Sequence, residues 1–360
     1  MQQAINDSDG ILGLVIYIDM DYFFAACEEL RHPELKGKPL IVGSAPEESR
    51  MRGVVQTCNY EARRFGIHSG MPSSDALKLK PDISYLPSDE AYYESMSSKI
   101  LNVLMQYNMK IEQMSVDEFA LDSGMYSYDI AERIAKEIKV SISSTTGLPC
   151  TVGVSIGKTF AKMACDQAKP NGLMVLEEKD LMQFLEDKDV GKLIGIGGKT
   201  KARLNAIDIK TIGDIRRANA SKLVAEFGAM GAYMYALANG RDPERVKDPA
   251  EALSIGRERT LEHNTEDRRE LLLEASKLAK VVVGELNQKG FLFKTVSIKA
   301  KYQDFTERIK SKTLRHYSNS LDMVSKSTEE MIDSVIVGKP IRKIGIRLST
   351  FTKSKGQRKL

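Results

Sequence analysis

Hydrophobic and polar residues follow two different periods along the first half of the chain. Short apolar runs rich in β-branched residues predict strands, and residues 12–18 have the character of a buried central strand. Apolar residues that recur every three or four positions predict helices between these strands. The predicted strands are 12–18, 39–42, 54–58 and 151–156, and the predicted helices are 22–30, 60–65, 69–81, 92–107, 130–144 and 158–168. Strands and helices therefore mix over roughly the first 175 residues, as in an α/β or α+β catalytic unit.

The remaining pattern predicts a hairpin, a helical region and a second domain. In residues 110–122, apolar residues flank the adjacent acids Asp117 and Glu118, which predicts a β-hairpin that presents this pair. Short helices joined by Gly-containing turns follow over 180–239. Residues 240–249 (GRDPERVKDP) combine Gly, two Pro and alternating charges, which predicts an interdomain linker. The predicted strands 254–260, 295–302 and 341–348 and helices 270–288 and 320–335 then indicate a compact α+β domain of about 100 residues.

Length and composition indicate a protein of several globular domains without a membrane segment. The 360 residues suggest two to four domains, and 42% hydrophobic and 28% charged residues are ordinary values. No apolar run approaches the roughly 18–20 residues that span a membrane. The polar first ten residues lack the pattern of a secretory signal. We therefore expect a cytoplasmic protein.

Cysteine and histidine spacing argues against zinc sites and disulfides. The widely spaced cysteines are expected to be small buried hydrophobic residues in a reducing compartment. Any catalytic metal would then be held by oxygen ligands, which favours a hard cation such as Mg²⁺. The residues concerned are Cys27, Cys58, Cys150 and Cys165, and His32, His68, His263 and His316.

The net charge of +4 is unevenly distributed along the chain. Residues 1–251 hold 30 Lys and Arg against 36 Asp and Glu, a net charge of −6. Residues 252–360 hold 23 against 13, a net charge of +10. The asymmetry suggests that the C-terminal part faces a polyanion. On charge alone, a solvated basic surface is an equal alternative.

Acidic residues at two strand ends are the first candidates for chemistry. Asp19 and Asp21 follow the first predicted strand and share one face by strand period. A carboxylate at the edge of a core is costly unless it is paired or bound to a metal, although capping of the next helix is the alternative. Asp117 and Glu118 repel each other, and a divalent cation resolves that repulsion. Two acidic clusters from separate strands match a two-metal site for phosphoryl transfer, with ions roughly 3.5–4 Å apart.

Cationic and hydroxyl side chains that could hold a triphosphate lie in two segments. In TCNYEARRFG, Thr57, Tyr60 and Arg63 are spaced i, i+3 and i+6, which predicts one helical face and a phosphate clamp. Lys169 precedes a Pro–Asn–Gly turn that would fix the place of its ammonium group. An ordinary surface helix and a surface lysine are the alternatives.

The segment LIGIGGKTKARLN predicts a helix–hairpin–helix. Its turn, residues 194–197, contains Gly195 and Gly197, which allow backbone N–H groups at a helix N-terminus to approach a DNA phosphate. Lys199 and Lys201 add positive charge there. A plain helical hairpin with glycine caps is the alternative.

Together these motifs resemble the Y-family of translesion DNA polymerases, particularly the DinB or DNA polymerase IV branch with its archaeal relatives. The resemblance covers about residues 14–352, and its motifs appear in order: DMDYFFA, KGKPLIVG, TCNYEARRFGI, SGMP, SVDEFALD, GVSIGKTFAKMA, AKPNG, the helix–hairpin–helix and IRKIGIRLS. It implies a multidomain α+β fold shaped like a right hand. The implied parts are a palm (1–22 and 90–177), fingers (23–89), a helical thumb (178–240), a linker (241–250), a little finger (251–352) and a tail (353–360).

The resemblance also implies roles for individual residues. Asp19, Asp117, Glu118 and the backbone carbonyl of Met20 fall on the ligands of two Mg²⁺ ions, for which Mn²⁺ is a possible substitute, while Asp21 is expected to be structural. Phe24 falls on the steric gate that excludes a ribose 2′-hydroxyl. The other implied nucleotide-binding residues are Tyr22, Phe23, Thr57, Tyr60, Arg63 and Lys169. The implied little-finger contacts with DNA are Arg257, Arg259, Arg308, Lys310, Lys312 and Arg347. At Gly157 many relatives carry Asn, a difference from which we expect little effect.

The last four residues, Gln357 to Leu360, match the first half of a sliding-clamp-binding peptide, Q-x-x-L followed by two aromatics. We expect the natural chain to continue through the aromatics, and a chance match is the alternative.

The function predicted from all these features is template-directed DNA synthesis of low fidelity. A monomeric polymerase would extend a primer on primer–template DNA past damaged bases, by two-metal-ion transfer from dNTPs. A nucleotidyl cyclase also presents acidic metal ligands, but it has no use for a helix–hairpin–helix and a basic domain. A non-catalytic DNA-binding scaffold is disfavoured by the intact acidic triad.

Overall fold

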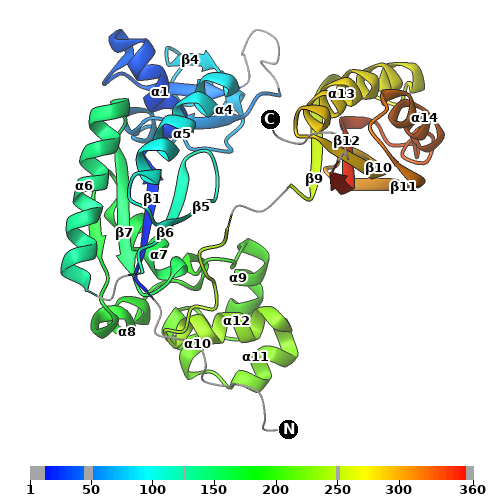
Figure 1. The fold of residues 1–360 in the computed structure, drawn as a ribbon. Helices are drawn as coiled ribbons and strands as arrows, with labels where there is room; N and C mark the ends of the chain where they lie inside the picture. Colours follow the sequence, from blue (N-terminus) through cyan, green and yellow to red (C-terminus); the bar gives the residue numbers. More distant parts are fainter. Residues whose placement is uncertain (1–12, 44–51, 125–126, 249–251, 354–360) are drawn as a thin grey trace. The chain divides into compact units, whose positions relative to one another are not determined.

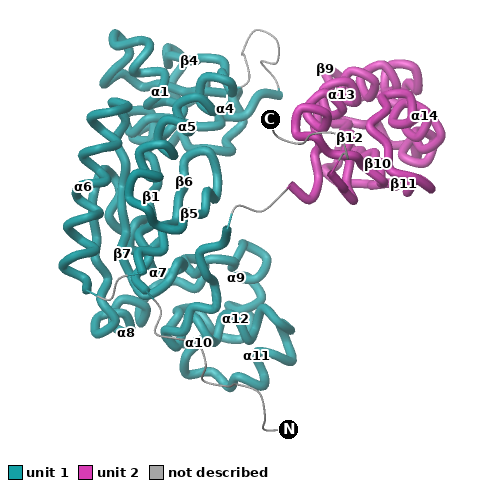
Figure 2. The backbone as a smooth tube through the Cα atoms, viewed as in Figure 1, with its two compact units in different colours: residues 1–249 teal, residues 250–360 magenta. Residues whose placement is uncertain are grey.

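Two compact units make up the chain, residues 1–249 and 250–360 (Figures 1 and 2). The computed structural model describes residues 13–43, 52–124, 127–248 and 252–353. The boundary between the units lies at the end of the predicted linker. Among the described residues, no helix has both the length and the apolar composition to cross a membrane.

A five-stranded sheet, in the order β5-β6-β1-β7-β8, forms the centre of the first unit. Its middle strand β1 is buried on both faces because successive side chains point in opposite directions. Ile16 and Ile18 join the main core, whereas Val15 and Tyr17 belong to a smaller apolar cluster on the other face. The strands are β1 (Val15–Met20), β5 (Lys110–Gln113), β6 (Glu118–Asp122), β7 (Cys150–Ser155) and β8 (Leu173–Val175). The predicted hairpin over 110–122 is confirmed as β5 and β6.

Three helices cover the two faces of this sheet. Helices α5 (Glu90–Met105) and α6 (Tyr128–Thr146) contribute to the main core on one face, and α7 (Lys158–Ala168) packs against β1 and β7 from the other. The buried residues of α6 follow helical spacing: Ala131, Ala135, Ile138 and Ile142. All three helices were predicted from this periodicity, and α7 has the predicted bounds.

A smaller sheet with its own helices and a separate helical part complete the first unit (Figure 1). The sheet has the order β3-β2-β4 and its own apolar core around Ile41, Val55 and Ile67. Its elements are α1 (Phe23–Arg31), η1 (Pro33–Leu35), β2 (Leu40–Gly43), β3 (Val55–Cys58), α3 (Tyr60–Arg63), α4 (Ser73–Leu79) and β4 (Ser84–Pro87). The helical part consists of α8 (Glu178–Glu186), η2 (Val190–Lys192), α9 (Gly198–Asn205), α10 (Ile212–Arg217), α11 (Ala220–Phe227) and α12 (Ala229–Ala238). All four cysteines are free and buried, as expected.

The second unit is an antiparallel sheet with two helices on one face. The strand order is β11-β10-β12-β9, and α13 and α14 share a core with the inward-facing side chains of the strands. The elements are β9 (Ser254–Thr265), α13 (Arg268–Gln288), β10 (Phe291–Tyr302), β11 (Glu307–Ser318), α14 (Leu321–Ile332) and β12 (Ile341–Lys353). Strand β11 was not predicted. It lies at the sheet edge with Leu314 as its single buried residue, so its sequence shows no apolar alternation.

Candidate active site

Two of the predicted metal ligands lie directly opposite each other in the central sheet. Asp19, near the end of β1, pairs in register with Glu118, the first residue of β6. Asp117 precedes Glu118 in the hairpin turn, and its backbone carbonyl accepts a hydrogen bond from the N–H of Met20 at 2.9 Å. The strand pairing therefore brings Asp19, Met20, Asp117 and Glu118 together at one end of the sheet.

Two lysines of the α7 segment neutralise this acidic pair. The Nζ of Lys169 lies 2.7 Å from Oδ1 of Asp19. Lys162 forms an ion pair with Glu118, and its Nζ lies 3.9 Å from Oδ2 of Asp19. Asp19 has the strand parity of Tyr17, whose side chain faces α7, and the Nζ of Lys162 also lies 5.0 Å from the Tyr17 ring. The side of β1 that carries Asp19 is thus the side on which α7 packs.

Burial and charge act in opposite directions on these carboxyl groups. Asp19 is only 5% exposed, and burial raises its pKa to about 7 although Lys169 and Lys162 oppose the shift. Burial would also raise the pKa of Glu118, but the hydrogen bond and charge of Lys162, with the charge of Lys169, outweigh it and lower that pKa. The acidic pair therefore depends on nearby positive charge to stay ionised.

Asp117 has a separate partner, and the acids do not converge on one point. Its Oδ1 accepts a hydrogen bond from the Ser115 hydroxyl at 2.5 Å. Within the described part of the chain, no three carboxylate, imidazole or thiol groups are close enough to form a preformed metal cluster. The carboxylate oxygens of Asp19 and Glu118 are paired with the lysines of the α7 segment instead. The donors that remain are hard oxygens, which suit a divalent cation of the Mg²⁺ type.

Asp21 is engaged by structural hydrogen bonds instead. Its carboxylate accepts bonds from the Thr151 hydroxyl at 2.9 Å, the Asn171 N–H at 2.7 Å and the Tyr60 hydroxyl at 3.3 Å. It is almost completely buried. These contacts agree with the structural role expected for Asp21, and they join β7, the AKPNG turn and α3 beneath the site.

The candidate steric gate is held by a stacked aromatic ring. Phe24 lies in the first turn of α1, and its ring stacks on Tyr93 of α5 with centroids 4.3 Å apart and planes at 14°. The Tyr93 hydroxyl donates a buried hydrogen bond of 2.7 Å to Glu28. Phe23, the neighbouring residue, is buried in the main core. The Phe24 ring therefore has little freedom to move away.

The predicted triphosphate residues do not all lie on one helix. Thr57 belongs to β3, and the helix begins only at Tyr60 because the Asn59 side chain caps it by accepting a bond from the Ala62 N–H. The expectation of a shared helical face for Thr57 is therefore wrong. The guanidinium of Arg63 lies 4.9 Å from the centre of the Tyr60 ring. Tyr60 in turn contacts Asp21 and, edge to face at 5.2 Å, the ring of Tyr22.

The helix–hairpin–helix turn lies between η2 and α9. Gly195 adopts a φ of +94°, a conformation that favours glycine, and Gly197 is the N-cap residue of α9. Leu193 and Ile196 anchor the turn in the helical core. Of the two predicted cations, Lys199 is exposed, whereas Lys201 forms an ion pair of 2.8 Å with Asp189.

The six basic candidates in the second unit do not share one face of the sheet. Arg257 and Arg259 have the parity of buried Ile255 and form ion pairs with Glu285 (2.7 Å) and Glu274 (3.5 Å) of α13. Arg308, Lys310 and Lys312 lie opposite buried residues of β10 and so have the parity of the helix-covered side. Arg347 has the opposite parity to Ile346 and Leu348 and lies on the face without helices, where it donates to the Ser254 hydroxyl at 2.8 Å. Contact of all six with DNA stays a prediction.

Lys162 is the site residue that the sequence analysis missed. A signal was present, because Lys162 lies within the predicted helix 158–168 and Lys169 directly follows that helix. The ion pair with Glu118 could not be foreseen, since it depends on which sheet face α7 covers.

Comparison with known proteins gives matches along most of the chain. Residues 18–166 match the impB/mucB/samB family, 252–360 match the C-terminal domain of that family, and 178–209 match the helix–hairpin–helix motif of the same group. A protein named DNA polymerase IV from Methanoculleus marisnigri is 39% identical over 337 residues, which is 93% of this chain and 94% of that protein.

Solved structures give the same result. A Y-family DNA polymerase chimera, Dbh-Dpo4(243-245)-Dbh, superposes with a TM-score of 0.88 at 32% identity, covering 95% of this chain and 100% of the other. An insertion ternary complex of Dbh DNA polymerase gives a TM-score of 0.68 at 32% identity and the same coverage.

Proposed function

The chain belongs to the Y-family (impB/mucB/samB) of translesion DNA polymerases, and from this premise we propose which of its residues carry out synthesis. It is a DNA-directed DNA polymerase that acts in lesion bypass, and its family uses divalent metal ions. The observation that carries the assignment of roles is the pairing of Asp19 with Glu118, with Asp117 next to them.

Asp19, Asp117, Glu118 and the backbone carbonyl of Met20 are the proposed ligands of two Mg²⁺ ions, with Mn²⁺ as a substitute. The donor set fits, because all its atoms are hard oxygens and the lysine ion pairs show how strongly these carboxylates attract cations. When bound, two such ions activate the primer 3′-hydroxyl and stabilise the charge on the departing pyrophosphate. The chain supplies no evident base for the 3′-hydroxyl proton among these residues.

The nucleotide is held by residues around this acidic cluster. Thr57, Tyr60 and Arg63 bind the triphosphate, and Lys169 exchanges its contact with Asp19 for a phosphate oxygen. Phe24 lies against the sugar and excludes a 2′-hydroxyl by steric contact, with Tyr22 and Phe23 beside it. Because Tyr60 bonds to Asp21, the phosphate-binding side chains stay in register with the acidic end of β1.

The parts of the chain correspond to the palm, fingers and thumb of a right-hand polymerase. The five-stranded sheet with α5, α6 and α7 is the palm, the small sheet with α1, α3 and α4 is the fingers, and α8 to α12 form the thumb. The helix–hairpin–helix and the basic second unit hold primer–template DNA, the class of ligand expected beside dNTP for a polymerase. The solved relative named as an insertion ternary complex supports this choice of partners.

The finer expectations about location and partners complete the proposal. The enzyme acts as a monomer in the cytoplasm. A sliding clamp is a further partner through the peptide that begins at Gln357, a segment that lies outside the described residues.

Primer extension with purified protein tests the proposed ligands. Asp117→Ala and Glu118→Ala are expected to abolish extension while DNA binding persists. Asp122→Asn is the matched control, because Asp122 is an acid at the other end of the same strand and should leave extension unchanged. Normal extension by both alanine variants would refute the assignment.

A further inference from the structure

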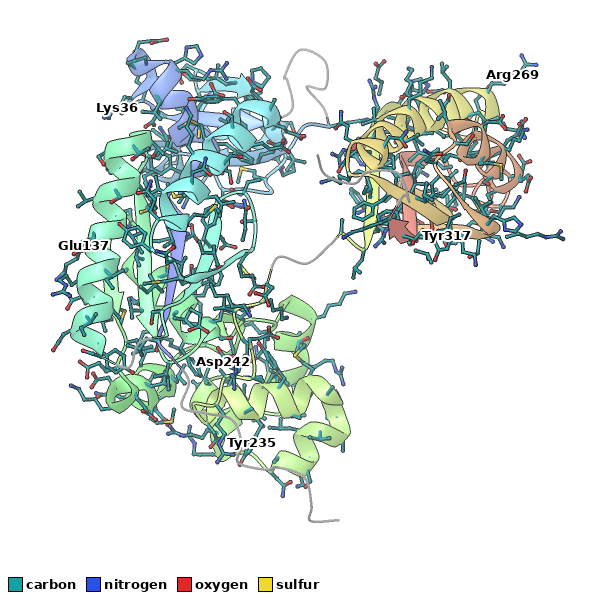
Figure 3. All side chains as sticks on the ribbon, viewed as in Figure 1. Lys36, Glu137, Tyr235, Asp242, Arg269 and Tyr317 are labelled. Carbon is teal, nitrogen blue, oxygen red and sulfur yellow. The ribbon has the colours of Figure 1, made fainter. Side chains whose placement is uncertain are left out.

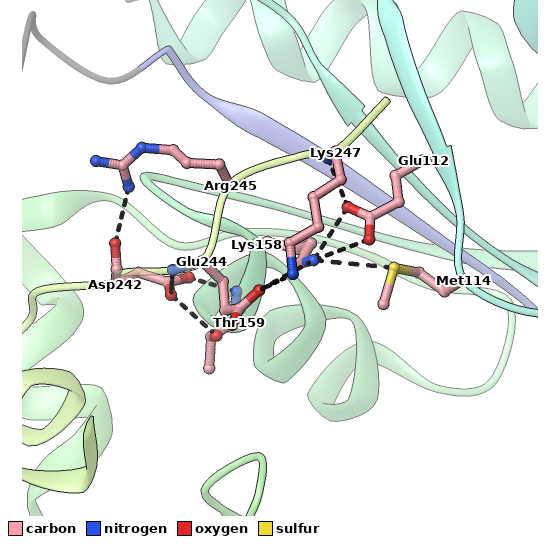
Figure 4. A network of polar contacts seen from close by, with 8 residues as sticks. All are labelled: Glu112, Met114, Lys158, Thr159, Asp242, Glu244, Arg245 and Lys247. Atoms are coloured by element: carbon pink, nitrogen blue, oxygen red, sulfur yellow. Dashed lines mark hydrogen bonds and ion pairs between the residues drawn. The ribbon is translucent and has the colours of Figure 1, made fainter. Parts of the chain in front are cut away.

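The segment predicted to be a linker is partly built into the catalytic unit. Residues 241–248, here called the strap, follow α12 and run across the edge of the palm sheet next to α7 (Figure 4). Asp242 is 6% exposed and lies where the helical part meets the rest of the first unit (Figure 3). Val246 is buried with Tyr17 of β1, Ala120 of β6 and Cys165 of α7. The part of the predicted interdomain linker up to residue 248 is therefore packed against the catalytic unit.

Charged groups attach the strap to the palm at several points. Lys158, the first residue of α7, is nearly buried and forms ion pairs with Glu112 of β5 at 3.0 Å and with Glu244 of the strap at 3.5 Å. The backbone N–H of Lys247 donates to Glu112 at 2.8 Å (Figure 4). The strap is thus joined to both the start of α7 and the first strand of the catalytic hairpin.

Asp242 performs the work of an N-cap for α7. The residue in the N-cap position is Gly157, which has no side chain with which to bond the free N–H groups of the first turn. One carboxylate oxygen of Asp242 accepts from the Thr159 N–H at 2.6 Å, and the other accepts from the Thr159 hydroxyl at 3.1 Å and the Glu244 N–H at 2.9 Å. A carboxylate at a helix N-terminus also interacts favourably with the helix dipole. This cap comes from 83 residues further along the chain.

Gly157 makes the arrangement possible. Its φ is +149°, and a Cβ built there would lie 2.8 Å from both the Cβ and the Oδ2 of Asp242. Any side chain at this position would therefore displace the carboxylate from the helix. Gly157 and Asp242 therefore depend on each other: Gly157 supplies no cap of its own and leaves the space that the Asp242 side chain occupies.

The capped helix carries both cations that contact the acidic pair. Lys162 lies one turn beyond Thr159 and pairs with Glu118, and Lys169 directly follows the end of α7 and contacts Asp19. Loosening of the first turn would change where the ammonium group of Lys162 lies, because its backbone is in the next turn. Val246 belongs to one buried cluster with Ala161 and Cys165 of the same helix.

We propose that Asp242 is a positioning residue for catalysis, which acts by fixing α7 and thereby the charge of Lys162 beside Glu118 and Asp19. The inference rests on the proposed roles of Asp19 and Glu118. The strap then contributes to the active site, because the segment that leads to the second unit also caps the first turn of α7, the helix that carries Lys162.

Single-turnover nucleotide incorporation tests this proposal on the full chain. Asp242→Ala is expected to slow incorporation on the order of 10- to 100-fold, the range for a displaced supporting group, with little change in the Kd for DNA. Asp242→Asn should fall between wild type and alanine, since its amide oxygen can still accept from the Thr159 N–H. Asp248→Ala is the control, because among the described residues this exposed strap acid pairs with Lys110 alone, and the variant should incorporate nucleotide normally.

A double-mutant cycle separates positioning from general stability. In a Lys162→Ala background, Asp242→Ala and Asp242→Asn should each slow incorporation less than about twofold, while their effect on Tm remains the same. An equal slowing with and without Lys162, or a normal rate in both Asp242 variants, would overturn the proposal. If Asp242→Ala does not fold, Asp242→Asn carries the cycle. Full extension by Glu118→Ala would instead refute the proposed function, whatever the strap variants do.

Discussion

Phe24 illustrates how one side chain can be fixed by its neighbours rather than by its own helix. Its ring lies flat on Tyr93, and Tyr93 is anchored to Glu28 through its hydroxyl. A stacked aromatic pair contributes roughly 0.5–1.5 kcal/mol beyond burial, so the ring resists displacement by a bulkier sugar. In the proposed role of Phe24 as steric gate, selection against ribonucleotides would depend on α5 as well as on α1.

Replacement of this ring should open the sugar pocket. We expect Phe24→Ala to raise ribonucleotide incorporation relative to deoxyribonucleotide by on the order of 100-fold, equivalent to about 2.7 kcal/mol of lost discrimination. The measurement is the ratio of kcat/KM for matched rNTP and dNTP. Phe65→Ala, at an exposed phenylalanine of the fingers, is the control and should keep the normal ratio. An unchanged ratio in Phe24→Ala would remove Phe24 from the gate.

At the scale of elements, hydrophobic periodicity predicted the helices and strands that bury a regular apolar stripe or face. The long helices α5, α6, α7, α13 and α14 and the catalytic hairpin were predicted because each buries a regular apolar stripe or face. Strand β11 was not predicted, because both of its faces are largely exposed. Thr57 was placed on one helical face with Tyr60 and Arg63 from the spacing alone, although it falls in the predicted strand 54–58, which the structure has as β3.

In the candidate site too, residues in short contiguous motifs were predicted, whereas residues whose role depends on contacts between distant segments were not. The candidate acids, steric gate and phosphate-binding residues could be named from motifs, because each motif is contiguous in sequence. Lys162 and Asp242 could not, since their roles depend on contacts across the fold. The basic residues of β9 and β11 were named without regard to strand parity, and five of them have the parity of the helix-covered side.

Helix α10 offers a test of stability at this scale. Thr211 and Asp214 form a capping box, and hydrogen bonds from the Thr211 and Lys210 N–H groups, with Arg217, hold the pKa of Asp214 well below its usual value. A carboxyl with a lowered pKa stabilises the fold above its unfolded pKa of about 3.9, and this contribution is lost as pH falls below that value. Asp214→Ala should therefore cost about 1 kcal/mol at pH 7 and progressively less below pH 4.

Thermal unfolding of wild type and Asp214→Ala at several pH values measures this difference. The gap in Tm should narrow as the solution is acidified from pH 5 toward pH 3. Asp208→Asn serves as the reference, because the side chain of this neighbouring acid forms no hydrogen bond or ion pair with the described residues and Asn tolerates the φ of +59° at this position better than Ala. A gap that is constant with pH would show that the Asp214 carboxylate contributes no charge-dependent stability.

At the scale of the whole molecule, charge is divided between the two units. The basic residues concentrate after residue 252, while the catalytic part is net acidic. Contacts with DNA phosphates release counterions, so affinity should fall steeply with salt. Because the catalytic part is net acidic, we expect it to contribute little to this salt dependence apart from the helix–hairpin–helix.

Arg347 and Arg259 make a matched pair for testing which sheet face meets DNA. Arg347→Ala should weaken DNA binding several-fold and reduce the slope of log affinity against log salt by about 1. Arg259→Ala should lower thermal stability, because it leaves Glu274 of α13 without this partner, and should change DNA affinity little. Fluorescence anisotropy with primer–template DNA between 50 and 200 mM salt gives both slopes. The reverse pattern would place DNA on the helix-covered side.

The helix cap that Asp242 forms beside Gly157 also determines where this chain can be recombined with its relatives. A crossover at residue 240 would bring in a foreign strap and separate the carboxylate from the glycine that makes room for it. A crossover after Asp248 keeps both partners of the cap from one parent. The suitable crossover point for exchanging C-terminal modules therefore lies after residue 248, about eight residues later than the start of the linker that the sequence pattern predicts.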